Sequence, residues 1–221
     1  LINVTASERI YTHDGAAASL PYALILDSLV NNTDLDPKFA VGGQLLLGGD
    51  VGPVPHARHR IISAGNGLIS HIGIPAASKA ELGDLMLLEG AAPFLRTQVF
   101  TISNFQEAKR LALAPKQRDS VLNESIRLFG HVQEALGLDP GVTKLAHPVT
   151  RAKLKKIVEV EPSHTSARLL LALALKRLPK TLTLRGSLEQ FEKVNDRMFR
   201  RRATSDLIAD LEELARKRNI L

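Results

Sequence analysis

The residues that could carry out chemistry gather near the start of the chain and on one predicted helix. Ser19 carries a hydroxyl that a neighbouring base could turn into a nucleophile, and the imidazoles of His13, His56 and His59 are the available bases. A serine in the first turn of a helix also has an ordinary role, because its hydroxyl bonds to nearby backbone. We favour that ordinary role and keep Ser19 as the fallback nucleophile.

The same histidines raise the question of a metal site. His56 and His59 are three residues apart and so share one face of a helix, and His13 followed by Asp14 would add ligands that Zn²⁺ accepts. The arginines on either side of His59 would repel a bound cation. We therefore predict a solvated basic surface at these histidines, no metal site and no cofactor.

Helices and short strands must position these side chains. Asp14-Gly15 forms a turn that opens a helix over 16–30, and apolar residues within it have the spacing of a stripe that faces a core. Ahead of the turn, the alternation over residues 1–5 predicts a half-buried strand. The expected core stripe of the helix consists of Tyr22, Ile25, Leu26 and Leu29.

A hairpin and a second helix follow. Residues 39–47 are expected to form a buried strand, and Gly48-Gly49-Asp50 a tight turn into a short return strand over 51–54. The next helix is expected from about His56 to Ala64, with Gly65 as its left-handed cap.

In this arrangement, residues 13–62 resemble the peptidase core of Lon-type proteases. The first element of that family reads Lys-Asp-Gly-Pro-Ser-Ala-Gly, with the serine as nucleophile. A later element reads Leu-Pro-Ile-Gly-Gly-Leu-Lys-Glu-Lys, with the first lysine as the base. Registered on Asp14-Gly15, the serine position here is Ala17, and registered on Pro53, the lysine position is Arg58.

The resemblance implies a site that has lost its chemistry. Ala17 has no hydroxyl, and the guanidinium of Arg58 stays protonated at any physiological pH, so it cannot accept a proton. The Thr-Gly-Glu of the family strand reads Gly42-Gly43-Gln44 here, so one engineered alanine would not account for all the differences. No phosphate-binding loop is present, so the ATPase of a full Lon is not in this chain. The positions carried over as a binding site are Asp14, Gly15, Ala17, Gly42, Gln44, His56 and Arg58.

The rest of the first half follows the order of a Lon proteolytic domain. We predict a strand over 69–75, a short helix with a capping box of Ser78 and Glu81, a strand over 98–102, and a helix over 105–113. The last helix is expected to be capped by Ser103 with Gln106. The resemblance covers about residues 1–113 and implies a ribosomal-protein-type βαβ layout. Because the part of a Lon domain before the nucleophile turn is largely missing, we expect that upstream sequence has been removed.

The second half is predicted to be all helical. A helix begins at Asp119 or Ser120 and ends at Gly137, and its apolar face includes Leu122 and Phe129. Further helices are expected over 149–160, 165–177, 187–202 and 204–217, with the helix over 165–177 at the buried centre and Ser187 with Gln190 capping the next. Residues 153–178 have the pattern of one tetratricopeptide-like helix pair. No copy follows at a step of about 34 residues, so an ordinary bundle is preferred.

The two halves differ in charge. Residues 1–110 carry a net charge of −2 and residues 111–221 a net charge of +8, which gives the second half an attraction to acidic partners. Its densest basic patch could neutralise phosphates, but only two phenylalanines flank it, and single-strand binders use a larger stacking platform. We prefer a solvated helix end and keep nucleic acid as an alternative partner. The patch consists of Lys193, Arg197, Arg200, Arg201 and Arg202.

The amino-acid composition restricts the classes of protein and of site that remain possible. The longest apolar run, from Leu169 to Leu175, is far shorter than the roughly 20 residues of a membrane helix, so no membrane partner is predicted. The chain has no cysteine, which excludes disulfides and thiolate metal sites. No signal peptide is visible, and the compartment stays open with a preference for the cytoplasm.

The predicted fold class is α+β, with a Lon-like domain over 1–114 and a basic helical domain over 115–221. The leading hypothesis is a silent pseudo-peptidase with a helical adaptor that binds protein or peptide, an extended peptide adding as a strand beside the old cleft. An active serine peptidase with a displaced nucleophile is the first alternative. A homo-oligomer is implied by the resemblance, because Lon peptidase domains assemble into rings.

Overall fold

A parallel sheet organises the part of the chain that the computed structural model describes, which is residues 15–138 and 140–199. Strands β1 (Phe39–Val41), β4 (His71–Pro75) and β5 (Gln98–Ile102) lie in the order β1-β4-β5. In the register, Phe39 lies opposite His71 and His71 opposite Gln98. Parallel neighbours need a crossover connection, and helices provide it here. The fold is therefore a mixture of α and β, as predicted.

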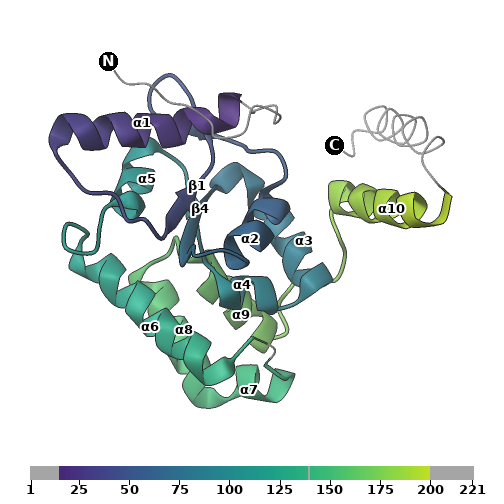
Figure 1. Ribbon diagram of the computed structural model, residues 1–221. Helices are drawn as coiled ribbons and strands as arrows, with labels where there is room; N and C mark the ends of the chain where they lie inside the picture. The colour runs from purple at the N-terminus through teal and green to yellow at the C-terminus, as the bar shows by residue number, and fades with distance from the viewer. Residues whose placement is uncertain (1–14, 139, 200–221) are drawn as a thin grey trace.

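Helices lie on both sides of the sheet (Figure 1). Each face of the sheet packs into its own buried cluster. Phe100 and Ile102 pack with α1 (Gly15–Asn31) and α5 (Phe105–Ala112). Side chains that alternate with them, such as Ile72 and Val99, pack on the other face. That face is covered by α2 (Ala57–Gly65), α3 (Lys79–Glu89) and α4 (Ala92–Arg96), with the short 3₁₀ turn Ala76–Ser78 ahead of α3.

The predicted strand over 39–47 is interrupted at Gly42-Gly43. After the break, β2 (Gln44–Leu45) pairs antiparallel with β3 (Val51–Gly52), and Gly48 and Gly49 have the positive φ angles of a tight turn. A Cβ at Gly43 would lie 2.6 Å from Val51 Cγ1 and 2.9 Å from Leu20 Cδ2. Only glycine allows the backbone to approach Val51 and Leu20 this closely. The chain leaves the sheet at this point and turns toward α1.

The predicted core stripe on α1 is wrong. Leu20 and Leu24 are buried against the hairpin and α5, and Ala17 is buried in the other cluster beside Ala57 of α2. All three lie on the face of the helix opposite the predicted stripe. Both faces are apolar, so the spacing alone did not show which one packs. The residues of the predicted stripe, Tyr22, Ile25, Leu26 and Leu29, are exposed together with Val30.

Three of the predicted cap assignments in the first half differ from the structure. Gly65 is the last residue of α2 and has no positive φ, and a Cβ there would lie 3.1 Å from Arg96 Cβ, so the glycine serves helix packing. Ser78 makes no side-chain cap. At α5 the cap is Asn104, whose oxygen accepts from the Glu107 N–H at 3.0 Å, one residue later than predicted. The Glu107 carboxylate in turn accepts from the Ser103 N–H at 2.7 Å.

The second half is helical throughout its described residues. Helix α6 (Ser120–Leu136) begins after Asp119, one of the two predicted starts, and Asp119 caps it by accepting from the Leu122 N–H at 2.8 Å. The structure adds α7 (Val142–Ala146), which the sequence did not indicate, before α8 (Pro148–Val160) and α9 (Thr165–Ala174). Phe129 on α6 and Leu170 on α9 belong to the same buried cluster as the sheet residues Ile72 and Val99. The division at residue 114 and the tetratricopeptide-like pair stay predictions.

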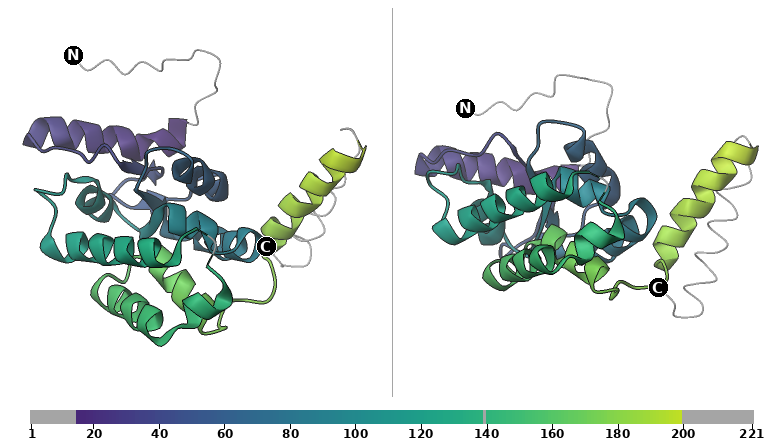
Figure 2. Two further views of the ribbon diagram at one scale, coloured as in Figure 1. Left: turned by 60° about the horizontal axis from the view of Figure 1, so that its bottom comes forward. Right: turned by 90° about the horizontal axis from the view of Figure 1, so that it is seen from below.

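Helix α10 (Leu184–Phe199) extends away from the rest of the molecule (Figures 1 and 2). Its first turn is held by Asp84 of α3, which accepts from the backbone N–H of Thr183 at 2.9 Å and from the Thr183 hydroxyl. Gly186 lies so close to Asp84 that a Cβ would overlap the carboxylate. The predicted cap Ser187 is inside the helix, where its hydroxyl donates to the Thr183 carbonyl.

Several predictions lie outside the described residues. They concern the strand over 1–5, the residues His13 and Asp14, the basic residues Arg200, Arg201 and Arg202, and the helix over 204–217. Lys193 and Arg197 fall on α10. Within the described ranges, no helix combines the length and the hydropathy needed to cross a lipid bilayer.

Candidate functional site

The position of the expected nucleophile lies at the start of α1 and is joined to the hairpin. Pro21 has no N–H and therefore leaves the carbonyl of Ala17 without its intrahelical donor. The Gly43 N–H donates to this carbonyl at 3.0 Å, and the Gly43 carbonyl accepts from the Leu20 N–H at 3.2 Å. The methyl group of Ala17 is buried in the cluster that also holds Val54 and Ala57. This arrangement anchors the helix and offers no reactive atom.

Arg58, at the position of the expected base, is buried in the first turn of α2. Its Nη2 donates to Glu89 Oε1 at 2.6 Å, and its Nη1 lies 4.0 Å from Glu189 Oε2. The guanidinium therefore points toward α3 and α10. Within the described residues, its Nε and Nη1 have no hydrogen-bond partner, and the enclosed space beside it is only about 10 Å³, room for about one water molecule. Arg58 is not open to a peptide carboxylate in this arrangement.

The fallback nucleophile Ser19 is occupied by backbone contacts on both sides. Its hydroxyl donates to the Ala16 carbonyl at 2.7 Å and accepts from the Leu45 N–H at 2.8 Å. These bonds tie the first turn of α1 to strand β2. The geometry matches the ordinary role of a serine in the first turn of a helix.

Replacing the hydroxyl of Ser19 should lower the free energy of unfolding. Ser19→Ala leaves the Leu45 N–H without its partner, which costs about 1–3 kcal/mol when the donor stays buried. Urea denaturation would measure the loss. The control is Ser63→Ala, at an exposed serine of α2, where a change within about 0.5 kcal/mol is expected. Equal stability of the two variants would contradict the structural role of Ser19.

The other residues carried over from the Lon resemblance are dispersed. Gly15 and Gln44 are exposed, and Gly42 is buried where a Cβ would lie 3.1 Å from Arg60 Nη1. His56 is exposed with φ 56°, and its ring lies edge-on to that of His59 with centroids 5.8 Å apart. Among the described residues, no three His, Asp or Glu side chains are grouped closely enough to hold a metal ion. The dyad assignment of Ala17 and Arg58 stays a prediction.

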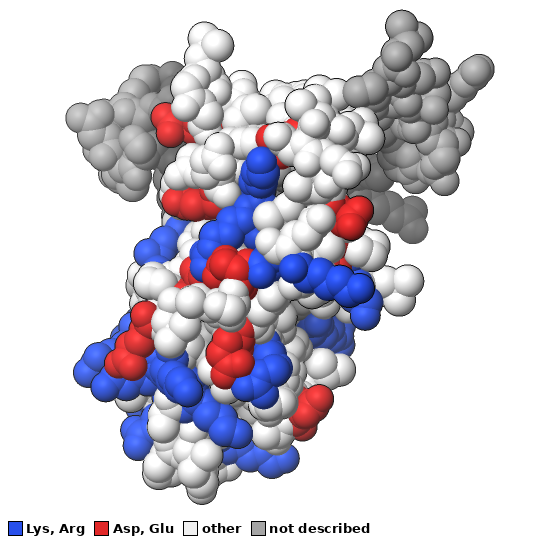
Figure 3. Space-filling view, turned by 90° about the vertical axis from the view of Figure 1, so that its left-hand side faces the viewer, with Lys and Arg blue, Asp and Glu red and all other residues white. Residues whose placement is uncertain are grey.

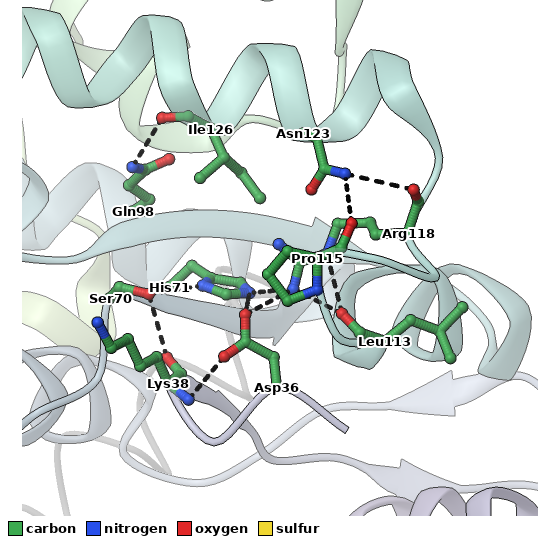
Figure 4. Close-up of polar contacts among 10 residues, drawn as sticks. All are labelled: Asp36, Lys38, Ser70, His71, Gln98, Leu113, Pro115, Arg118, Asn123 and Ile126. Carbon is green, nitrogen blue, oxygen red and sulfur yellow. Dashed lines mark hydrogen bonds and ion pairs between the residues drawn. The ribbon is translucent and has the colours of Figure 1, made fainter. Parts of the chain in front are cut away.

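A buried polar cluster that the sequence did not indicate joins three distant segments (Figure 4). Asp36 precedes β1, His71 begins β4, and Arg118 lies between α5 and α6. Arg118 Nη2 donates to Asp36 Oδ2 at 2.9 Å and to the Leu113 carbonyl at 2.8 Å, and it lies 3.1 Å from His71 Nε2. On the other side of the ring, Ser70 Oγ lies 2.8 Å from His71 Nδ1.

Charge and burial determine the protonation of this cluster. Burial, and then the positive charge of Arg118, lower the pKa of His71 to about 4, although Asp36 opposes the shift. Burial alone would raise the pKa of Asp36, but bonds from the Lys38 N–H and Arg118 outweigh it, so the pKa is lowered. At neutral pH the cluster therefore contains a neutral imidazole between a carboxylate and a guanidinium.

The sequence of contacts from Ser70 through His71 to Asp36 looks like a nucleophile, a base and an acid, but its hydrogen bonds run the other way. A guanidinium can only donate, so the Nε2 facing Arg118 is the unprotonated nitrogen and Nδ1 carries the proton. Nδ1 then donates to Ser70 Oγ and cannot take a proton from it. The cluster therefore acts as a structural clamp: it holds together the three segments that carry Asp36, His71 and Arg118. No pattern in the sequence connects Asp36 and Arg118 with His71.

A second buried histidine joins the sheet to the helical half. The ring of His164 lies between Phe100 and Phe129, with centroids 4.4 and 4.5 Å away. Its Nδ1 accepts from the Ala167 N–H at 3.3 Å, and its Nε2 faces Gln98 Oε1 at 3.3 Å. Burial lowers the pKa of His164 to about 3, so this ring is also neutral at physiological pH.

Comparison with known proteins gives a partial similarity to Lon proteases. The chain is 25% identical over 126 residues to a Lon protease of Salinispora arenicola, which covers 53% of this chain and 16% of that protein. It is 32% identical over 85 residues to a Lon protease of Borrelia duttonii, which covers 38% of this chain and 10% of that protein. The chain thus spans a small part of these relatives. No protein-family model matches the sequence.

Proposed function

From this partial similarity, we propose that the chain is a Lon-related domain without peptidase chemistry that works by binding protein or peptide partners. The observation that carries the proposal is the state of Arg58, which is buried and bound to Glu89. A guanidinium held in this way has no proton-accepting role. The hydroxyl of Ser19, the fallback nucleophile, is taken up by two backbone groups.

In the three-stranded sheet, the edge to which an extended peptide could add is that of β1. The far edge of β5 is covered, because the Thr101 N–H donates to the Ser163 carbonyl at 2.9 Å. Strand β1 is the outer strand on the other side, and its residues are half-buried where those of β4 are buried. A hollow of about 330 Å³ beside β1, lined by Leu24, Phe39 and Val41 among others, offers room for alternate side chains of an added strand.

Fluorescein-labelled casein, an unfolded protein, tests the proposal. Anisotropy should rise when the chain is added, with no release of fragments, and Ser19→Ala should behave in the same way. A serine-directed phosphonate should leave the chain unlabelled. Fragment release or labelling at Ser19 would establish the displaced-nucleophile peptidase instead. No change in anisotropy would remove the support for peptide binding.

A basic surface on α7, α8 and the segment that follows α9 favours nucleic-acid association as a second candidate function. Its side chains are exposed or half-exposed, and Figure 3 shows Lys and Arg gathered on the lower part of the molecule. Within the described residues, an acidic partner is present for one of them, Lys155, whose Nζ lies 3.6 Å from Glu159. The surface consists of Lys144, Arg151, Lys153, Lys155, Lys156, Lys176 and Arg177.

The salt dependence of the affinity for nucleic acid tests whether this basic surface contacts phosphates. Phosphate contacts make the affinity for a DNA or RNA duplex fall steeply with salt, with a slope of about 0.9 per phosphate contact on a double-logarithmic plot. Lys156→Glu should lower the affinity and flatten that slope, whereas Lys116→Glu, at an exposed lysine outside the surface, should not. Binding that is equally sensitive to both substitutions, or no binding at low salt, would exclude a nucleic-acid function for this surface.

A further inference from the structure

Helix α8 carries positive charge in two rows. Arg151 and Lys155 are four residues apart and form one row along the helix. Lys153 and Lys156 are three residues apart and form the second row. Positions two residues apart, such as Arg151 and Lys153, differ by about 200° around a helix. The two rows therefore lie on opposite flanks of α8.

The inner and the outer side of α8 between these rows differ. Leu154 and Ile157 point inward and are fully buried in the cluster shared with α6 and α9. On the outer side, Ala152 lies between the rows and is exposed. Two turns further along this side, Glu159 pairs with Lys155 at 3.6 Å. The first half of α8 is therefore a ridge of small, uncharged side chains with a row of cations on each flank.

The separation of the rows fits the two backbones of a DNA duplex. An α-helix with its side chains is about 10–12 Å across, and the major groove of B-form DNA is about 12 Å wide. A helix in that groove has a phosphate backbone on each side, which is where α8 carries its cations. A single strand offers one backbone, and the major groove of an RNA duplex is too deep and narrow for side chains to read.

The residue types of the basic surface favour contacts with phosphates over contacts with bases. Residues 140–180 contain no Phe, Tyr or Trp, so they cannot stack on unpaired bases as single-strand binders do. Five of the seven cations are lysines, which bind phosphate as point charges, whereas base edges are read mostly through the bidentate contacts of Arg, Asn or Gln. The side chain of Ala152 could contact only a thymine methyl group.

We propose that α8 lies in the major groove of double-stranded DNA, with one row of cations on each backbone and little preference for base sequence. Such binding rests on the nucleic-acid candidate described above, and it specifies the partner and the helix that holds it. Helices α7 and α9 pack against α8, so Lys144 of α7 and the pair Lys176 and Arg177 after α9 extend the contact along the backbones. Figure 1 places α7 and α8 at the end of the molecule opposite α1.

Fluorescence anisotropy with labelled nucleic acids tests the choice of partner. A short DNA duplex should bind at least about tenfold more tightly than its single strand or the matching RNA duplex, because only the DNA duplex engages both rows. A DNA duplex of unrelated sequence should bind equally well. With four cations of α8 on phosphates, the affinity should fall with salt with a slope of at least about 3.6 on a double-logarithmic plot.

The possible failures of this test differ in meaning. A single strand or an RNA duplex that binds as tightly as the DNA duplex would overturn the proposal and leave nucleic-acid association standing. Polyglutamate that binds as tightly would overturn it as well, because an acidic chain without grooves would then satisfy the surface. If no nucleic acid binds at low salt, both proposals are wrong.

Substitutions on α8 test how the helix is seated. Ala152→Glu places a carboxylate between the rows, where it would face both backbones, and should lower the affinity for the DNA duplex by about tenfold or more. Ala80→Glu, at an exposed alanine of α3, is the matched control and should bind normally. Both variants should melt like the unchanged chain, because both side chains are exposed.

One substitution in each row completes the test. Arg151→Gln and Lys153→Gln should each reduce the salt slope by about 0.9, the loss of one phosphate contact. Equal binding by the Ala152 and Ala80 variants, or a slope that depends on one row alone, would show that α8 does not lie in the groove. A loss of affinity in Lys156→Glu would in that case still support nucleic-acid association.

Discussion

Lowering the pH from 7 to 4 is expected to destabilise this protein strongly. His71 and His164 are buried and neutral, and their pKa values are lowered from 6.5 to about 4 and about 3. In the unfolded chain the same rings take up a proton near pH 6.5. Between pH 6.5 and 4, the unfolded state therefore binds more protons than the folded state, and the free energy of unfolding falls as the pH falls.

The size of the effect follows from the two shifts. Each histidine removes about 1.4 kcal/mol per pH unit in the window between the unfolded and folded pKa values. From pH 6.5 to 4 this amounts to about 3 kcal/mol for each ring. Two such losses are comparable with the whole stability of a typical domain, about 5–15 kcal/mol. Above about pH 7.5, where the imidazoles are neutral in the folded and the unfolded state, the two rings should contribute almost no pH dependence.

Urea denaturation at pH 7, 6, 5 and 4 would measure this loss. His164→Asn should flatten the dependence by about half, because asparagine retains an acceptor for the Ala167 N–H and does not titrate. His131→Asn, at an exposed histidine of α6, should leave the dependence unchanged. If stability is the same at pH 7 and pH 4, the two histidines are not buried in the neutral form.

Removal of the Arg118 side chain is expected to cost about 3–5 kcal/mol, the usual consequence of breaking a buried ion pair. Arg118→Met takes away the donor to Asp36 and both bonds to the Leu113 carbonyl, at 2.8 and 3.1 Å. The carboxylate of Asp36 then stays buried without its cation. Methionine fills part of the volume, so the loss measures chiefly the unpaired polar groups.

A matched substitution separates this effect from the loss of any arginine. Arg127→Met removes an exposed arginine whose ion pair with Glu124 lies on the surface of α6, and it should cost under about 1 kcal/mol. Urea denaturation gives both values. In the Arg118 variant the pKa of His71, followed by NMR of its ring protons, should rise, because one cause of its depression is gone and Asp36 remains beside it. Equal losses in the two variants, or an unchanged His71, would contradict the clamp.

Local signals in the sequence predicted most of the secondary structure. Asp119 and Gly137 bound α6 as expected, because a cap and a left-handed glycine act within a few residues. The strand over 98–102 was also predicted with its bounds. These features are all determined by residues that are close to one another in the sequence.

Features that depend on tertiary contacts could not be predicted in the same way. The packed face of α1 uses Ala17, Leu20 and Leu24, whose small and apolar side chains gave a weaker pattern than the exposed stripe opposite. The contact between Asp36 and Arg118 joins residues that are 82 positions apart, with no motif to connect them. The sequence predicted which positions belong to the candidate site. It did not predict that Arg58 is buried there by Glu89 and α10.

The attachment of α10 gives this helix the mechanics of a lever. It is held at one end through Thr183, Gly186 and Asp84, and its 16 residues span about 24 Å. A tilt of about 10° at the base would therefore move the far end by about 4 Å, roughly three residues of helical rise. Small rearrangements on α3 are thus amplified at the tip, where a change too subtle to detect near Asp84 becomes a displacement that distance measurements can resolve.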